Sequence, residues 1–195
     1  MEGKMNIEKF IWDDWDPDVS YSAGIAPIIL GASPKVLLIR QEEGTIRTQK
    51  GGETYREQAW WKVPFGKEDV EDSDPENIAL REGLEETGCF FQKEDLVSVV
   101  HKRILSRRPG HQTYHEDYFF LGLFDKELAP IQNITDKRVC GACYFPLDYL
   151  PITGKEPGAL GTRIAQKHLW GIYSLCMEHR NLEEQIYRYG NQLRL

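Results

Sequence analysis

The segment between Asp74 and Gly88 constrains the fold most, because it carries its own signals for where a helix begins and ends. Asp74 can accept a hydrogen bond from the backbone at the start of a helix, and Pro75 suits the first helical position. Ser73, in a capping box, is an alternative start. Gly88 readily adopts the left-handed conformation that ends many helices. We therefore predict a helix over residues 75–87.

Strand signals lie on both sides of this helix. Apolar runs bounded by turn residues predict strands at 22–30, 35–40, 96–105, 118–124 and 143–147, and a short apolar segment at 59–65. Residues 41–59 are polar and contain three glycines, which predicts a long loop. Apolar residues at helical spacing predict a second, amphipathic helix at 162–180. The order predicts an α+β fold, a mixed sheet with helices packed on it.

The length of 195 residues suits one domain with extensions. Residues 1–19 are rich in Trp and Asp and are predicted to form an N-terminal extension. The domain itself is predicted at 20–180, followed by a C-terminal tail or short helix at 181–195. Hydrophobic residues make up 41% of the chain and charged residues 28%, which is enough apolar material for a packed core.

The charge and the apolar patterning exclude several classes of protein. A net charge of −7 disfavours binding to extended nucleic acid, which depends on many Lys and Arg contacts with phosphates. No apolar run is long enough for a membrane span, and the N-terminus does not resemble a signal peptide. We expect a cytoplasmic protein whose four cysteines are free thiols. The Cys140-x-x-Cys143 pair is interpreted as two ordinary cysteines, since no second pair of zinc ligands follows.

The predicted helix gathers three glutamates on one side. Glu82, Glu85 and Glu86 fall within an arc of roughly 100° on an α-helix. A solvated acidic face is the ordinary explanation, but clustered hard oxygen ligands also suit Mg²⁺ or Mn²⁺. Because like charges at this spacing repel, replacing one of them, as in Glu86→Gln, should leave the metal-free protein as stable or slightly more stable.

Two neighbours of the cluster carry further expectations. Arg81 stands four residues before Glu85 and can orient that carboxylate. Leu80 and Leu84 are predicted to anchor the opposite side of the helix in the core.

The string Arg81-Glu82-x-x-Glu85-Glu86-x-Gly88 resembles the second half of the Nudix box, G-x5-E-x7-R-E-U-x-E-E-x-G-U with U aliphatic. Gly66 would be its opening glycine, and Trp61-x-x-Pro64-x-Gly66 is similar to the usual lead-in. The box departs from the pattern in three ways. It is one residue longer before the arginine, Asp72 stands near the place of the first glutamate, and Gly83 replaces an aliphatic residue, which would permit close packing against a strand.

The resemblance implies an α/β/α sandwich with the box helix packed on a mixed sheet. It also implies an Mg²⁺-dependent hydrolase, with Mn²⁺ as a substitute, in which water attacks a diphosphate linkage of a small nucleotide-like molecule. On that basis the metal ligands would be Gly66, Glu82, Glu85 and Glu86. Catalysis would rest on Glu82, Glu85 and Arg81, and a general base would come from the box or from Glu116, Glu127 or Asp136. Candidate substrate contacts are Arg40, Trp61 and Arg103.

Other functions remain open at this point. The fold could have become a nucleotide-binding regulatory module without catalysis, although the complete glutamate cluster argues against this. Isopentenyl diphosphate isomerase has the same fold, but Cys89 does not lie in a recognisable isomerase motif. A homodimer is also left open, and the identity of the diphosphate is not predicted.

Overall fold

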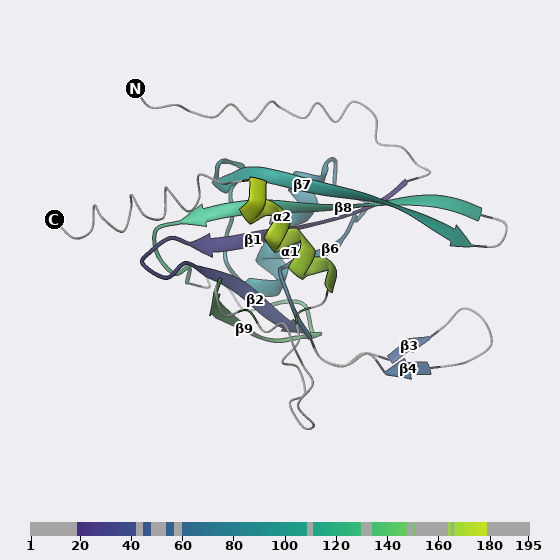
Figure 1. Cartoon of the computed structure of the whole chain (residues 1–195). Helices are drawn as coiled ribbons and strands as arrows, with labels where there is room; N and C mark the ends of the chain where they lie inside the picture. The colour runs from purple at the N-terminus through teal and green to yellow at the C-terminus, as the bar shows by residue number, and fades with distance from the viewer. Residues whose placement is uncertain are drawn as a thin grey trace.

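The computed structural model describes residues 19–41, 45–47, 54–56, 60–108, 111–129, 134–147, 150, 164 and 166–178. In that part of the chain, seven strands form one mixed sheet whose main path runs β5-β2-β1-β8-β7, with β6 paired to β1 and β9 paired to β2 (Figure 1). The strands are β1 (Val19–Ile29), β2 (Lys35–Gln41), β5 (Trp60–Lys62), β6 (Phe65–Lys67), β7 (Leu96–Arg108), β8 (His111–Phe124) and β9 (Val139–Pro146). Strands β1 and β8 pair in parallel and the other pairs are antiparallel.

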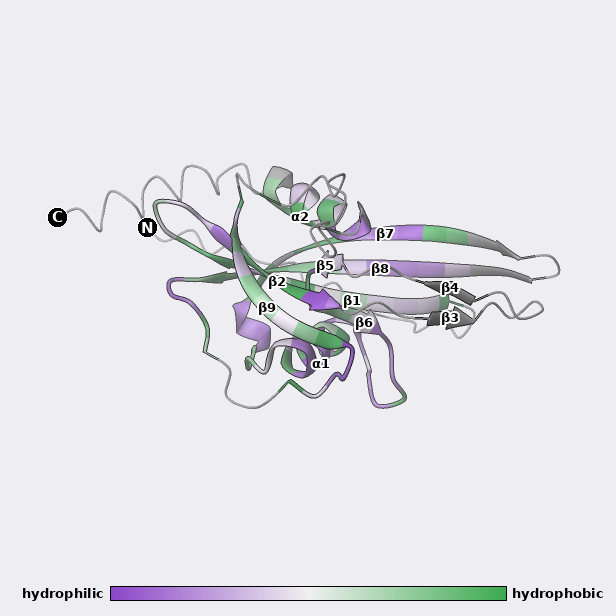
Figure 2. Ribbon diagram, turned by 90° about the horizontal axis from the view of Figure 1, so that it is seen from below, coloured by the Kyte–Doolittle hydropathy of each residue, from purple (hydrophilic) through white to green (hydrophobic). Residues whose placement is uncertain are grey.

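Two helices cover the two faces of this sheet. Helix α1 (Pro75–Thr87) lies on one face and α2 (Gln166–Glu178) on the other (Figure 2). A single 3-10 turn, η1 (Lys93–Asp95), precedes β7, and β3 (Thr45–Arg47) pairs with β4 (Thr54–Arg56) as a separate ribbon. The predicted α/β/α sandwich with a mixed sheet is confirmed.

The core is divided by the central strand β1, which is buried on both sides. Ala26 and Ile28 belong to the cluster that packs against Ile172 of α2, whereas Ile25 belongs to the cluster that packs against Ile78 of α1. A strand buried on both faces has a continuous apolar sequence rather than an alternating one. This explains the unbroken run in the middle of the chain's first strand.

The caps of α1 agree with the sequence. The Asp74 carboxylate accepts a hydrogen bond of 2.7 Å from the backbone N–H of Asn77, and Pro75 occupies the first turn. Gly88 has φ of 69°, in the left-handed region, and its N–H donates to the Leu84 carbonyl at 2.8 Å. The predicted start at Asp74 and stop at Gly88 are confirmed.

The prediction that Leu80 and Leu84 anchor α1 holds in part for Leu80, which is partly buried and packs against the core cluster on this face, and is wrong for Leu84. The fully buried apolar face of the helix is formed by Ile78, Ala79 and Gly83. A Cβ at Gly83 would lie 2.7 Å from the Phe91 ring and 3.2 Å from Ile25. The glycine therefore lets α1 approach β1, as predicted, and this approach turns part of the glutamate cluster toward the protein interior.

The other elements lie close to their predicted places. Strands β7 and β8 are longer than predicted and form an extended hairpin, and part of the predicted loop at 41–59 forms the β3–β4 ribbon. The second helix begins at Gln166, and Ile164 bridges to Trp61 instead. All four cysteines are free thiols. The expectations for residues 1–18 and 179–195 lie outside the described residues, so the domain limits stay a prediction. Neither described helix combines the length and apolar character that a membrane span requires.

Candidate active site

Gly66 of β6 lies directly against Glu82 of α1. A Cβ at position 66 would overlap the carboxylate of Glu82. Glu82 is only 7% exposed, and this burial raises the pKa of its carboxyl, although the neighbouring Arg81 partly offsets the shift. The opening position of the box therefore has room only for glycine, because any side chain there would displace the buried Glu82 carboxylate.

Arg81 holds the box together. Its guanidinium donates to Glu82 Oε1 at 2.7 Å and to Glu85 Oε2 at 3.3 Å. It also binds the Asp72 carboxylate at 2.8 Å and the Lys67 carbonyl at 2.7 Å. The predicted orientation of Glu85 by Arg81 is confirmed. Arg81 thereby joins the helix to the preceding loop through Asp72, whose carboxylate also accepts a hydrogen bond from the backbone N–H of Asp69 at 2.8 Å.

Glu86 is the most buried of the three glutamates, with 1% of its surface exposed. Its carboxylate accepts a hydrogen bond of 2.7 Å from the Lys62 ammonium group and one of 2.8 Å from the backbone N–H of Phe65. Burial raises the pKa of Glu86 to about 7, since the cost of desolvating the charge exceeds what Lys62 and the N–H return. Lys62 also donates to the Phe65 carbonyl at 2.8 Å. The backbone of Phe65 therefore binds both members of the Lys62–Glu86 ion pair, Glu86 through its N–H and Lys62 through its carbonyl.

Glu85 is the exposed member, with 42% of its side chain accessible. The loop that precedes β9 contacts the backbone of Glu85. The N–H groups of Thr135 and Asp136 in this loop donate to the Glu85 carbonyl at 3.0 and 3.3 Å. The Asp136 carboxylate binds Arg138 at 2.9 Å. Burial would raise the pKa of Asp136, but Arg138 outweighs it and lowers that pKa. Asp136 therefore lies beside the glutamate helix as an ionised carboxylate.

The other two candidate bases lie in different surroundings. Glu127 pairs with Lys35 at 3.1 Å in an exposed position near the turn between β1 and β2. Glu116 lies on β8, where it pairs with Arg103 at 3.2 Å and accepts a hydrogen bond from the Tyr118 hydroxyl. Among the described contacts, neither carboxylate touches the box. Asp136 is the candidate that the structure brings to the helix.

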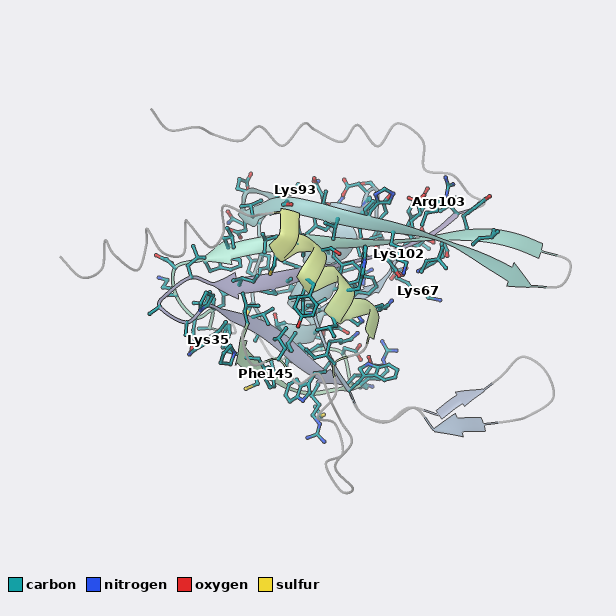
Figure 3. The ribbon with its side chains drawn as sticks, viewed as in Figure 1. Lys35, Lys67, Lys93, Lys102, Arg103 and Phe145 are labelled. Carbon is teal, nitrogen blue, oxygen red and sulfur yellow. The ribbon has the colours of Figure 1, made fainter. Side chains whose placement is uncertain are left out.

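The predicted substrate contacts are also separated. Arg103 is stacked over the Tyr114 ring, 4.3 Å from its centroid, on the β7–β8 hairpin (Figure 3). Arg40 and Trp61 face each other across β2 and β5, and the Trp61 ring meets Phe145 edge-on at 4.8 Å. Trp61 is partly buried against the core on the α2 face. These residues stay predictions as substrate contacts.

The sequence did not single out Lys62 or Arg138. Lys62 is the lone charge in an otherwise apolar segment, and that isolation is a signal for a buried ion pair. The hydrogen bond from Arg138 to Asp136 raises the pKa of Arg138 most, and the charges of Asp136, Glu86 and Glu82 raise it further. It had no detectable signal, because only the loop docking brings it close to the helix.

Comparison with known families identifies the family of this chain. The NUDIX domain model matches residues 21–163, most of the chain. The chain belongs to the Nudix family. Among curated proteins, none matches it significantly.

Solved Nudix structures share the fold at low sequence identity. A NUDIX hydrolase from Nitrosomonas europaea has TM-score 0.50 and 18% identity, and the match covers 83% of this chain and 90% of that one. The NUDIX domain of Shewanella oneidensis NrtR, solved with ADP-ribose, has TM-score 0.51 and 16% identity, with coverage of 85% and 94%. A MutT/nudix family protein from Enterococcus faecalis, with TM-score 0.45 and 18% identity, matches 68% of this chain, which spans only 45% of that protein's length.

The donor set of this Nudix site suits a hard divalent cation, but it is not fully assembled. Three carboxylates and the Gly66 carbonyl supply oxygen ligands of the kind that Mg²⁺ prefers. Within the described ranges, however, no three acidic, imidazole or thiol groups converge closely enough to hold an ion as they stand. Glu82 and Glu85 face Arg81, and Glu86 faces Lys62. Binding therefore requires these carboxylates to turn toward a common point.

Proposed function

We propose that this protein hydrolyses a diphosphate linkage in a small nucleotide-like substrate, with Mg²⁺ as cofactor and Mn²⁺ as a substitute. The observation that carries the proposal is the burial of Glu82 and Glu86 beside a glycine whose backbone leaves room for a carboxylate. Burying two like charges is costly unless they serve a positive partner. Lys62 and Arg81 offset only part of that cost, since the pKa of each of these glutamates stays raised.

The ligands for the cation would be Glu82, Glu85, Glu86 and the Gly66 carbonyl. When bound, it would neutralise charge on the diphosphate oxygens and lower the pKa of water. Residues of the chain position the helix and accept the proton. Arg81 fixes the glutamate helix against the loop, and a carboxylate accepts the proton of the attacking water. The bond between the water oxygen and the attacked phosphorus forms as the bridging P–O bond breaks, and the bridging oxygen leaves with the other phosphorus, which gives two phosphorylated products.

Asp136 is the favoured base outside the box. Its backbone is docked on α1 through Glu85, and its carboxylate is held ionised by Arg138. Glu116 is a weaker candidate because Arg103 and Tyr118 already occupy its oxygens. Glu127 lies at the exposed turn between β1 and β2 and is the weakest.

A small substrate fits the charge of the molecule. The net charge of −7 disfavours an extended phosphate backbone, whereas a cation at the glutamates would supply local positive charge for one diphosphate. The NrtR domain was solved with ADP-ribose, so ADP-ribose is the first compound to test.

The experiment is turnover of a panel by the purified protein: ADP-ribose, dinucleoside polyphosphates, nucleotide sugars, nucleoside triphosphates and a 5′-triphosphate RNA. We expect Mg²⁺-dependent release of two phosphorylated products from a small compound, abolished by excess chelator. Turnover that persists in chelator would refute the metal requirement. A preference for the RNA of a hundredfold or more in kcat/KM, about 2.7 kcal/mol, would refute the substrate class.

A further inference from the structure

A second charged cluster lies on the face of the sheet that α2 covers, away from the glutamates. We call it the Asp117 cluster, and it consists of Ser20, His115, Asp117 and Lys167. The Asp117 side chain is almost fully buried, and its Oδ1 lies 2.9 Å from His115 Nε2 and 3.5 Å from the Lys167 ammonium. His115 Nδ1 in turn lies 2.6 Å from the Ser20 hydroxyl. The nudix box plays no part in these contacts.

Lys167 connects this cluster to the candidate active site through Phe65. Its ammonium lies 4.1 Å from the centroid of the Phe65 ring. The backbone N–H of the same Phe65 donates to Glu86, and its carbonyl accepts from Lys62. Because Lys167 is the second residue of α2, this contact places the beginning of that helix beside β6 (Figure 1). Phe65 is therefore the one residue between the Lys167 ammonium group and the Lys62–Glu86 ion pair.

The contacts of Lys167 leave it able to bind a ligand. Its distance of 3.5 Å to Asp117 is longer than the 2.7–2.9 Å typical of a charge-assisted hydrogen bond, and His115 already binds the same oxygen. An ammonium group has three donors, and Asp117 is its hydrogen-bond acceptor within the described residues. About half of the side chain, 47%, is exposed. Asp117 and the ring thus position Lys167, and within the described residues Asp117 uses one of the three donors of the ammonium group.

The local charge also favours an anion. Burial lowers the pKa of Lys167, Asp117 partly restores it, and the positive charges of Lys62 and Lys67 lower it again. Lys67 is the last residue of β6, next to Gly66 (Figure 3). Lys62 is already paired with Glu86 at 2.7 Å, so a phosphate bound at Lys167 would offset the repulsion that Lys62 and Lys67 exert on its ammonium group.

We propose that Lys167 is a substrate-binding residue whose ammonium group, positioned by Asp117 and the Phe65 ring, binds a phosphate of the diphosphate substrate. This inference rests on the proposed function, because it takes the glutamate helix as the place where the diphosphate is cleaved. Lys167 contributes to binding and not to the chemical step. It therefore lowers KM and leaves kcat nearly unchanged.

The test uses imidodiphosphate, a diphosphate analogue whose bridge resists hydrolysis, titrated calorimetrically in Mg²⁺ into the full chain. We expect Lys167→Met to weaken binding about tenfold, equal to about 1.4 kcal/mol. Lys167→Arg keeps the charge and should bind closer to wild type than Lys167→Met does. Lys35→Met is the matched control, because it also breaks a Lys–carboxylate pair, at 3.1 Å, in an exposed position near the turn between β1 and β2. It should bind within twofold of wild type.

Kinetics on the best substrate of the panel give the second readout. KM should rise about tenfold in Lys167→Met with kcat within twofold, a split that a merely structural defect would not produce. Lys167→Gln is measured alongside, so that a folding failure of the Met variant leaves the test intact. Binding by the Met and Gln variants within twofold of wild type would overturn the proposal, as would a loss in Lys167→Arg as large as in Lys167→Met.

The two proposals fail separately. If wild type binds imidodiphosphate more tightly than Lys167→Met but cleaves no nucleotide, the proposed hydrolysis is wrong and the phosphate contact stands. If wild type cleaves a nucleotide and Lys167→Met has the same KM, the phosphate contact is wrong and the hydrolysis stands.

Discussion

His168 makes the stability of this protein depend on pH in a direction that the structure fixes. The side chain lies on α2, is 3% exposed, and meets the rings of Phe65 and Phe119 edge-on at 5.0 and 5.7 Å. Burial lowers its pKa well below the usual value, and Lys167 and Lys62 lower it further. Its Nδ1 has no hydrogen-bond partner in the described part of the chain. The folded protein therefore holds His168 neutral.

The magnitude follows from proton linkage. Because the unfolded chain takes up a proton near pH 6.5 and the folded one does not, stability falls as the pH drops below that value. Each pH unit costs about 1.4 kcal/mol until the folded pKa is reached. Between pH 7.5 and pH 5.0 the loss is about 2 kcal/mol, or roughly 4–8 °C in Tm for a domain of this size.

The assay compares urea denaturation of wild type and His168→Leu at both pH values, in chelator. The variant should be as stable as wild type at pH 7.5 or slightly more so, since an unpaired buried nitrogen is removed. It should lack the acid loss of about 2 kcal/mol. Glu86 titrates in the opposite sense in both proteins, so it cancels in the comparison. Equal losses between pH 7.5 and 5.0 in the two proteins would refute the reasoning.

Three further substitutions test the box. Gly66→Ala should push the Glu82 carboxylate off Arg81 and lower kcat by about a hundredfold, because a displacement of about 1 Å at a reacting centre can cost that much; near-wild-type kcat would contradict the packing. Glu86→Gln should be at least as stable as wild type at pH 8 in chelator, since burial raises the Glu86 pKa to about 7 and ionisation above it costs folding energy, while turnover falls. A loss of several kcal/mol in urea would show a structural role. Asp74→Ala should cost about 1 kcal/mol by removing the helix cap, measured by thermal melts, and no change in Tm would refute it.

Local signals in the sequence were sufficient for the helix and most strands. Asp74 and Gly88 act on backbone groups within one turn, so their roles depend on little else. The same holds for Gly83, whose missing side chain allows α1 to approach β1. The spacing of four residues between Arg81 and Glu85 similarly indicated their contact, whereas the contacts of Arg81 with Glu82 and Asp72 were found only in the structure.

Contacts between distant segments could not be derived in this way. Glu86 was predicted to lie on a charged helix face, yet Lys62 is 24 residues away and meets it only because β5 and β6 fold beside α1. The choice of Asp136 over Glu127 depends on the docking of its loop on the Glu85 carbonyl. Leu84 was misplaced, and Leu80 is only partly buried against the core, because the helix packs through the neighbouring face of Ile78, Ala79 and Gly83.

The most direct test of the central claim is the Mg²⁺-dependent kcat of Glu85→Gln on the best substrate of the panel. Glu85 has 42% of its side chain exposed, so the substitution removes a ligand without emptying the core. Glu76→Gln is the matched control, because Glu76 lies on the same helix and pairs with Lys93 at 3.1 Å, outside the cluster of Glu82, Glu85 and Glu86. The account predicts a loss of about a hundredfold or more in Glu85→Gln, about 2.7 kcal/mol, and less than twofold in Glu76→Gln. A kcat for Glu85→Gln within threefold of wild type would contradict it.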